Sequence, residues 1–282
     1  MGTKKQIGNG SVGIQAERDV TVNVGLTVAE VEKLTKLFLE ENFPQLRQDA
    51  MEAARGNVAR LLSEFEFQLA RRLHDVDIGK FGDPDVQYTL NEAVVETAKR
   101  GERANIDLLV SLVLERVSKG SGDLLSLACS DAVRVVPRLT RPQIDYLSVA
   151  MFFSHMSIPK LPNITVYEKF AQLAHAIVES ASGVSEWDEL YLESQRCLVH
   201  LNIGRDDVYI ELKSKYPALK DVSPEEIKRD IMEKTTYFKD FVGVYEKYRM
   251  NFLRLTLVGQ LVAAVNMNRY LPGSADISKM IK

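Results

Sequence analysis

The sequence predicts a mainly α-helical fold of one or two helical bundles, preceded by a short β-patterned N-terminal arm. Helix-capping patterns recur along the chain, glycine and proline separate the segments between them, and apolar residues near the C-terminus follow helical spacing. The 282 residues are 45% hydrophobic and 27% charged, as is ordinary for a globular protein. We expect an arm over 1–25, an N-terminal bundle over 26–156 and a C-terminal bundle over 164–282.

The arm differs from the body because its apolar residues alternate with polar ones at period two, which is typical of extended chain. The residues that share a face within its two segments are Val12, Ile14, Ala16, Val20, Val22 and Val24. An isolated two-stranded hairpin is marginal in water. We therefore predict that the arm pairs with arms of other chains, and a hairpin packed on its own body or a disordered tail are the alternatives.

Helix starts are marked by capping boxes, in which a Ser or Thr and a Glu or Gln three residues later bind each other's backbone N–H groups. The matching segments are Thr27–Glu30, Thr140–Gln143, Thr165–Glu168 and Ser223–Glu226. Asp83-Pro84 marks a further start, since proline fits the first helical turn.

These starts, with the glycines and prolines between them, define the expected helices. Their ranges are 27–42, 44–75, 84–100, 104–119, 122–137, 140–156, 165–182, 185–201 and 224–268. We expect the last helix to break near Gly243 or Met250. Val208-Tyr209-Ile210 fits either a strand or a turn of helix, and residues 157–163 fit a boundary between the two bundles.

Aromatic residues in the expected last helix follow a 3-4-3-4 spacing, which places them on one helix face. They are Phe238, Phe241, Tyr245, Tyr248 and Phe252, and Leu255, Gly259 and Val262 continue the pattern. One interpretation is a core helix. The others are an interface with a partner, where aromatic residues are enriched, and a stacking surface for single-stranded nucleic acid.

Two basic clusters are candidates for anion binding: Lys99, Arg100 and Arg103, and Arg134, Arg138 and Arg141. Either could contact a phosphate-bearing ligand, and ordinary solvated surface charge is the alternative. The formal net charge of -3 gives no global electrostatic case for nucleic acid.

The sequence contains no nucleophile, metal or phosphate-loop signature of the common kinds. Cys197 and His200 lie three residues apart, but a zinc site needs about four ligands and no second pair has suitable spacing. We therefore expect neither a cofactor nor an enzyme.

The cysteines and the longest apolar run indicate where the protein is located. Cys129 and Cys197 fit a reducing compartment, and the apolar run Leu255–Val265 is too short to span a membrane. We therefore expect a cytoplasmic protein.

The arm also carries a short motif, whose matching residues are Gln6, Gly8, Ser11, Ile14, Gln15, Ala16, Asp19 and Val20. It resembles a motif that opens many bacterial proteins with helical bodies, several of which look like immune or anti-phage components. It is also loosely similar to amyloid-signalling motifs of bacteria and fungi. The run Leu255–Gly259, followed by Asn266, resembles the end of an uncharacterised bacterial family. The resemblance implies a bacterial, cytosolic, oligomeric protein with a role in defence.

The first hypothesis is a non-enzymatic, homo-oligomeric assembly or scaffold protein that assembles through the arm and binds itself or another protein. The second is a nucleic-acid or nucleotide sensor that uses the basic clusters. The third is an enzyme with an unrecognised helical active site.

Overall fold

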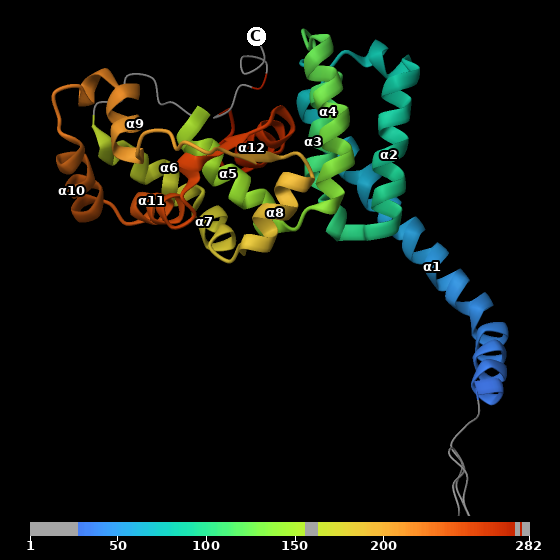
Figure 1. Cartoon of the computed structure of the whole chain (residues 1–282). Coiled ribbons are helices and arrows are strands. Elements are labelled where there is room, and N and C mark those ends of the chain that lie inside the picture. The colour runs from blue at the N-terminus through green and yellow to red at the C-terminus, as the bar shows by residue number, and fades with distance from the viewer. Residues whose placement is uncertain (1–27, 156–162, 274–276, 278–282) are drawn as a thin grey trace, which may run out of the picture. The chain divides into compact units, whose positions relative to one another are not determined.

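A computed structural model describes residues 28–155, 163–273 and 277, and these residues are mainly α-helical, as the sequence predicted (Figure 1). The chain divides into two compact units, residues 1–51 and residues 52–282. The arm over 1–25 lies outside the described residues, so its strand pairing stays a prediction. None of the described helices is both long and apolar enough to cross a membrane.

The first helices of the chain largely follow the expected ranges. They are α1 (Val28–Arg72), α2 (Pro84–Arg100), α3 (Ile106–Arg116), α4 (Asp123–Val135) and α5 (Arg141–His155), with short 3-10 turns η1 (Ile78–Gly82), η2 (Gly101–Ala104) and η3 (Val136–Arg138). The expected break between 42 and 44 is wrong, because α1 continues through Pro44. A proline removes one backbone hydrogen bond, and here the turns on both sides continue the helix.

The C-terminal half has shorter elements than expected. The helices are α6 (Tyr167–Leu173), α7 (His175–Ala181), α8 (Glu186–Ser194), α9 (Val208–Lys215), α10 (Pro224–Lys234), α11 (Tyr237–Lys247) and α12 (Leu257–Tyr270). The 3-10 turns are η4 (Ile164–Val166), η5 (Pro217–Leu219) and η6 (Met250–Phe252). Strands β1 (Leu198–His200) and β2 (Leu253–Leu255) pair antiparallel, with Leu198 opposite Leu255.

Two of the expected helices are wrong, because the chain forms a strand within each expected range. The helix expected over 185–201 ends at Ser194, and the one expected over 224–268 is interrupted at 235–236 and again at 248–256. The break near Met250 is confirmed, whereas Gly243 lies inside α11. Val208-Tyr209-Ile210 is helical. A three-residue strand is stabilised by a partner that is distant in sequence, and helical spacing in one segment does not reveal that partner.

Two capping boxes form as predicted. The Thr140 backbone N–H donates to Gln143 Oε1 at 2.9 Å, and the Gln143 N–H donates to Thr140 Oγ1 at 3.4 Å. Ser223 and Glu226 form the same reciprocal pair at the start of α10. Thr27 lies outside the described residues, so the first box is not described.

The box expected at Thr165–Glu168 is wrong. Asn163 accepts a hydrogen bond from the Thr165 N–H at 3.1 Å instead. The Glu168 carboxylate accepts from three backbone N–H groups at the start of α11, those of Thr236, Tyr237 and Phe238, at 3.0, 3.2 and 3.0 Å. Burial raises the pKa of the Glu168 carboxyl, but these donors outweigh it and hold the pKa below its usual value. Glu168 therefore caps α11 from α6.

Helices α5 and α12 lie at the centre of one core within residues 52–282. Helix α12 packs against α3, α4 and α5, and α5 packs against α7. Figure 1 shows α2, α3 and α4 side by side. Helix α5 precedes the expected boundary at 157–163 and α7 and α12 follow it, so both expected bundles contribute to the same core.

Helix α12 begins in direct contact with the backbone of the segment before β1. Thr256 caps α12 by accepting from the Gly259 N–H at 3.2 Å, and the Thr256 N–H donates to the Cys197 carbonyl at 3.0 Å. A Cβ atom on Gly259 would lie 1.9 Å from that carbonyl oxygen. Only glycine therefore permits this approach of the two segments.

We expect Gly259→Ala to destabilise the protein by about 3 kcal/mol, because the new methyl group overpacks against fixed backbone. Gly243→Ala is the matched control, since nothing lies within 4 Å of a Cβ there. It should stabilise the protein by about 0.5–1 kcal/mol, as expected for replacing glycine within a helix. Urea unfolding of both variants measures the difference, and similar midpoints would contradict the close approach.

Candidate protein-binding surface

Helix α8 displays the single tryptophan of the chain to solvent. Trp187 is 80% exposed, and Leu190 and Tyr191, three and four residues further on, are also exposed. This spacing places the three side chains on neighbouring positions of one helix surface. Leu192 is fully buried and anchors α8 to the core. An exposed cluster of Trp, Tyr and Leu is typical of sites that bind other proteins.

Polar contacts with α5 hold α8 in place. Ser185 and Asp188 form a capping box in which Asp188 Oδ2 accepts from the Ser185 N–H at 2.8 Å and from the Ser185 hydroxyl at 2.6 Å. The Gln143 side-chain N–H donates to Asp188 Oδ1 at 2.8 Å, and the buried Tyr146 hydroxyl donates to Glu189 Oε1 at 3.0 Å. Hydrogen bonds from the Ser185 side chain and backbone lower the pKa of Asp188 and outweigh its partial burial.

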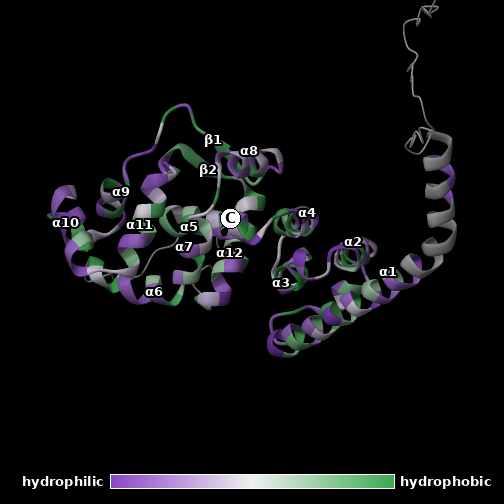
Figure 2. Cartoon of the chain, turned by 90° about the horizontal axis from the view of Figure 1, so that it is seen from below, coloured by the Kyte–Doolittle hydropathy of each residue, from purple (hydrophilic) through white to green (hydrophobic). Residues whose placement is uncertain are grey.

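A cavity of about 610 Å³ opens beside α8, β1 and the end of α11. Figure 2 shows β1 and β2 next to α8. The cavity, which we name the α8 groove, is lined by Glu186, Glu189, Leu190, Glu193, His200, Lys247, Tyr248 and Arg249. It therefore adjoins the exposed Trp187 directly along the helix.

The α8 side of the groove is acidic. Its carboxylates belong to Glu186, Glu189 and Glu193, and α8 contains no basic residue. His200 from β1 lies between two of them, with Nε2 at 3.6 Å from Glu189 Oε2 and Nδ1 at 3.0 Å from Glu193 Oε2. No partner is found for the exposed Glu186 carboxylate among the described residues.

Two cations that line the groove from the end of α11 are held by groups other than carboxylates. Lys247 Nζ donates to the Ser182 carbonyl at 2.8 Å and lies 4.6 Å from the centroid of the Tyr248 ring. The Arg249 guanidinium lies 4.5 Å from the centroid of the Phe252 ring. The groove therefore has an acidic wall on α8 and a basic wall at the end of α11.

The aromatic residues predicted as a stripe do not lie on one helix, because α11 ends at Lys247. Phe238, Phe241 and Tyr245 are buried in the core, where Phe241 packs against Phe152 with ring centroids 4.8 Å apart. For these three residues, the structure agrees with the interpretation that the stripe belongs to a core helix. Tyr248 and Phe252 are partly exposed, and Tyr248 lines the α8 groove.

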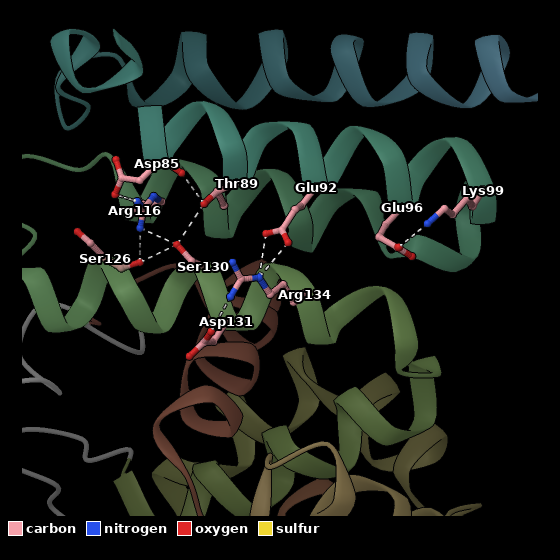
Figure 3. A network of polar contacts seen from close by, with 10 residues as sticks. All are labelled: Asp85, Thr89, Glu92, Glu96, Lys99, Arg116, Ser126, Ser130, Asp131 and Arg134. Carbon is pink, nitrogen blue, oxygen red and sulfur yellow. Dashed lines mark hydrogen bonds and ion pairs between the residues drawn. The ribbon is translucent and has the colours of Figure 1, made fainter. Parts of the chain in front are cut away.

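The basic clusters are largely paired with carboxylates. Lys99 and Arg100 contact Glu96 at 3.1 and 3.2 Å. Arg134 contacts Glu92 at 2.9 Å and Asp131 at 3.2 Å, as Figure 3 shows for the facing surfaces of α2 and α4. The same figure shows the buried Arg116 held by Asp85, Ser126 and Ser130.

Arg141 is partly exposed and joins a polar network with the buried Asp145 and Asn266. Its guanidinium Nε lies 3.3 Å from Asp145 Oδ2, and its Nη2 donates to Asn266 Oδ1 at 2.7 Å. The Asn266 amide donates to Asp145 Oδ1 and Ser148 Oγ, both at 2.8 Å. Arg103 and Arg138 are exposed. Four of the six predicted basic residues therefore have carboxylate partners.

The cysteines are unreactive in this fold. Cys129 and Cys197 are fully buried, and burial raises the pKa of each thiol to about 12. Cys197 lies in the turn before β1 and His200 within β1, so they do not share a helix face. No group of three or more potential metal ligands occurs in the part of the chain that the structure describes.

The fold defines a mainly α-helical protein, and among the described residues the most exposed aromatic side chain is Trp187 of α8. The chain belongs to a family of uncharacterised type, whose model matches residues 25–223 and 211–281. No curated protein and no solved structure shows a significant match.

The sequence interpretation missed the α8 surface. The segment Glu186–Ser194 reads as an ordinary capped helix with mixed polar and apolar residues. A usable signal was present, because the single tryptophan lies among four acidic residues with no basic residue nearby. Leu192 lies five residues after Trp187 and so on a different face of the helix, which means that burying Leu192 against the core leaves Trp187 exposed.

Acrylamide quenching of the intrinsic fluorescence tests the exposure of Trp187. Because no other tryptophan is present, we expect quenching close to that of a free tryptophan derivative. Strong protection that disappears on dilution would show that a second copy covers α8. Protection at all concentrations would contradict the exposed position.

We expect Asp188→Asn to destabilise the protein by about 1 kcal/mol at neutral pH, the usual size of a helix-cap loss. Since the folded-state pKa of Asp188 is lowered, its contribution is fully present above the unfolded pKa of about 3.9 and is lost as pH falls through the folded-state pKa. The variant and the natural protein should therefore converge in urea unfolding at acidic pH. Glu233→Gln, at an exposed site in α10, is the control and should change stability by less than about 0.5 kcal/mol.

Proposed function

We propose that this chain is a non-enzymatic assembly protein of the cytoplasm, which self-associates through the arm over 1–25 and presents its helical body to another protein. The observation that carries the proposal is the exposed Trp187 on a helix that is hydrogen-bonded to α5. Tryptophan and tyrosine are the residues most enriched at the energetic centres of protein interfaces.

The arm supports self-association through its pattern of apolar residues. Burying one side chain such as Val20, Val22 or Val24 is worth at most about 1.5–3 kcal/mol. Several arms that pool these side chains would offset part of the cost of ordering the segment, and backbone hydrogen bonds between the arms would add to this gain. The assembled bodies then hold several α8 surfaces at high local concentration, which strengthens a weak contact with a multivalent partner.

The resemblance of the arm motif to bacterial anti-phage components supports a role in defence, in which assembly would accompany recognition of a partner. A nucleic-acid or nucleotide sensor is less favoured. Such a sensor needs a cluster of cations that are free to bind phosphate, and in each of the two clusters only one described residue, Arg103 or Arg138, has no carboxylate partner.

Val22→Asp should convert a defined oligomer into a monomer, because a charge would enter the shared apolar face of the arms. Helical content should stay near that of the natural protein. Asn23→Asp adds the same charge on the opposite face of the extended segment and is the matched control, which should remain assembled. Light scattering after size exclusion measures the mass.

The same measurement on a chain lacking residues 1–25 provides a second test. If Val22→Asp and this shortened chain both keep the mass of the natural oligomer, the arm is not the assembly element. If the natural protein is itself monomeric, self-association through the arm is contradicted.

A further inference from the structure

We infer that the α8 groove binds a basic segment of a partner protein, whose lysine or arginine side chain lies against the α8 carboxylates while an apolar side chain covers Trp187 and Leu190. This inference rests on the proposed function, since it names the chemistry of the partner that the assembled bodies would recognise. It commits to a peptide segment of another protein as the occupant.

Charge complementarity is the first argument. Glu186, Glu189 and Glu193 lie at positions i, i+3 and i+7 of α8, so their carboxylates follow one side of the helix. His200 engages the second and third of these carboxylates, and Glu186 keeps an exposed carboxylate at the open end, directly before Trp187. A cationic side chain can therefore reach Glu186 without displacing a described contact.

The neighbouring apolar surface is the second argument, because a small cation would leave it uncovered. Trp187 is 80% exposed and Leu190 is 47% exposed. A peptide that places a basic residue in the groove also brings an adjacent apolar residue onto this surface. The groove volume of about 610 Å³ exceeds the space that one side chain fills, so it leaves room for part of the peptide backbone.

The basic wall of the groove sets the orientation of the segment. Lys247 and Arg249 would repel a second cation placed near them, whereas they can face the carbonyl groups of a peptide. The basic side chain therefore lies on the α8 side and the peptide backbone on the α11 side. Nucleic acid fits the α8 side of this surface poorly, because its phosphates would meet three carboxylates there and could contact only Lys247 and Arg249 at the end of α11.

The natural full-length chain supplies its own reporter, since Trp187 is its single tryptophan and the emission reports on the surroundings of α8. The probe is an amphipathic peptide of about three helical turns, built from lysine, leucine and alanine, and the matched probe carries glutamate in place of lysine. We expect a saturable blue shift of the emission with the lysine peptide, weaker at high salt, and none with the glutamate peptide.

The variant Glu186→Gln with Glu193→Gln should weaken binding of the lysine peptide about fivefold, the effect of losing exposed ion pairs. Both substitutions keep side-chain size, and the glutamine that replaces Glu193 can still hydrogen-bond His200. The control, Glu66→Gln with Glu233→Gln, makes the same change in net charge at exposed positions of α1 and α10 and should bind as the natural chain does. Equal shifts with both peptides, no saturable shift with either, or unchanged binding by the test variant would overturn the inference.

Repeating the titration with full-length Val22→Asp separates this inference from the proposed assembly. If the natural chain assembles through its arm and neither peptide binds, the groove inference fails while the assembly proposal stands. If the lysine peptide binds equally to both chains and the natural chain is a monomer, the groove inference stands while the assembly proposal fails.

Discussion

The burial of α12 is the constraint on which the rest of the body depends. Residues 261–267 of this helix are buried on every side, so Asn266, the one amide side chain among these seven residues, must be satisfied inside the core. Asn266 meets Asp145 and Ser148 of α5 and accepts from Arg141. An unsatisfied buried amide costs about 1–3 kcal/mol, and this network therefore fixes the register of α5 against α12. Gln143 and Tyr146, on the same helix α5, in turn position α8.

Local chemistry made much of the helical fold predictable. Proline at the first turn of α2 and the capping boxes at Thr140 and Ser223 depend on residues close together in sequence, and the helices begin where these signals place them. Contacts between distant residues were not predictable in this way. Glu168 has the spacing of a local cap and instead binds the start of α11, about seventy residues away.

The aromatic spacing shows why periodicity alone misled the prediction of the C-terminal helices. Phe238, Phe241 and Tyr245 do lie on α11, but Leu255 continues their spacing from a strand and Val262 from another helix. Buried positions are apolar in all three elements, so the spacing of apolar residues continues although the helix itself is interrupted. The α8 surface was hidden for the opposite reason, because exposure of Trp187 depends on which helices cover the core and not on the residues next to it.

The buried thiols have a practical consequence for chemical labelling. Only the thiolate form of cysteine attacks alkylating reagents, and Cys129 and Cys197, the two cysteines of the chain, are both covered and held in the thiol form at neutral pH. The folded chain therefore needs no cysteine removal before site-directed attachment of a dye or crosslinker. A single cysteine introduced at the exposed Ser194 on α8 would carry the label alone, within reach of whatever binds there.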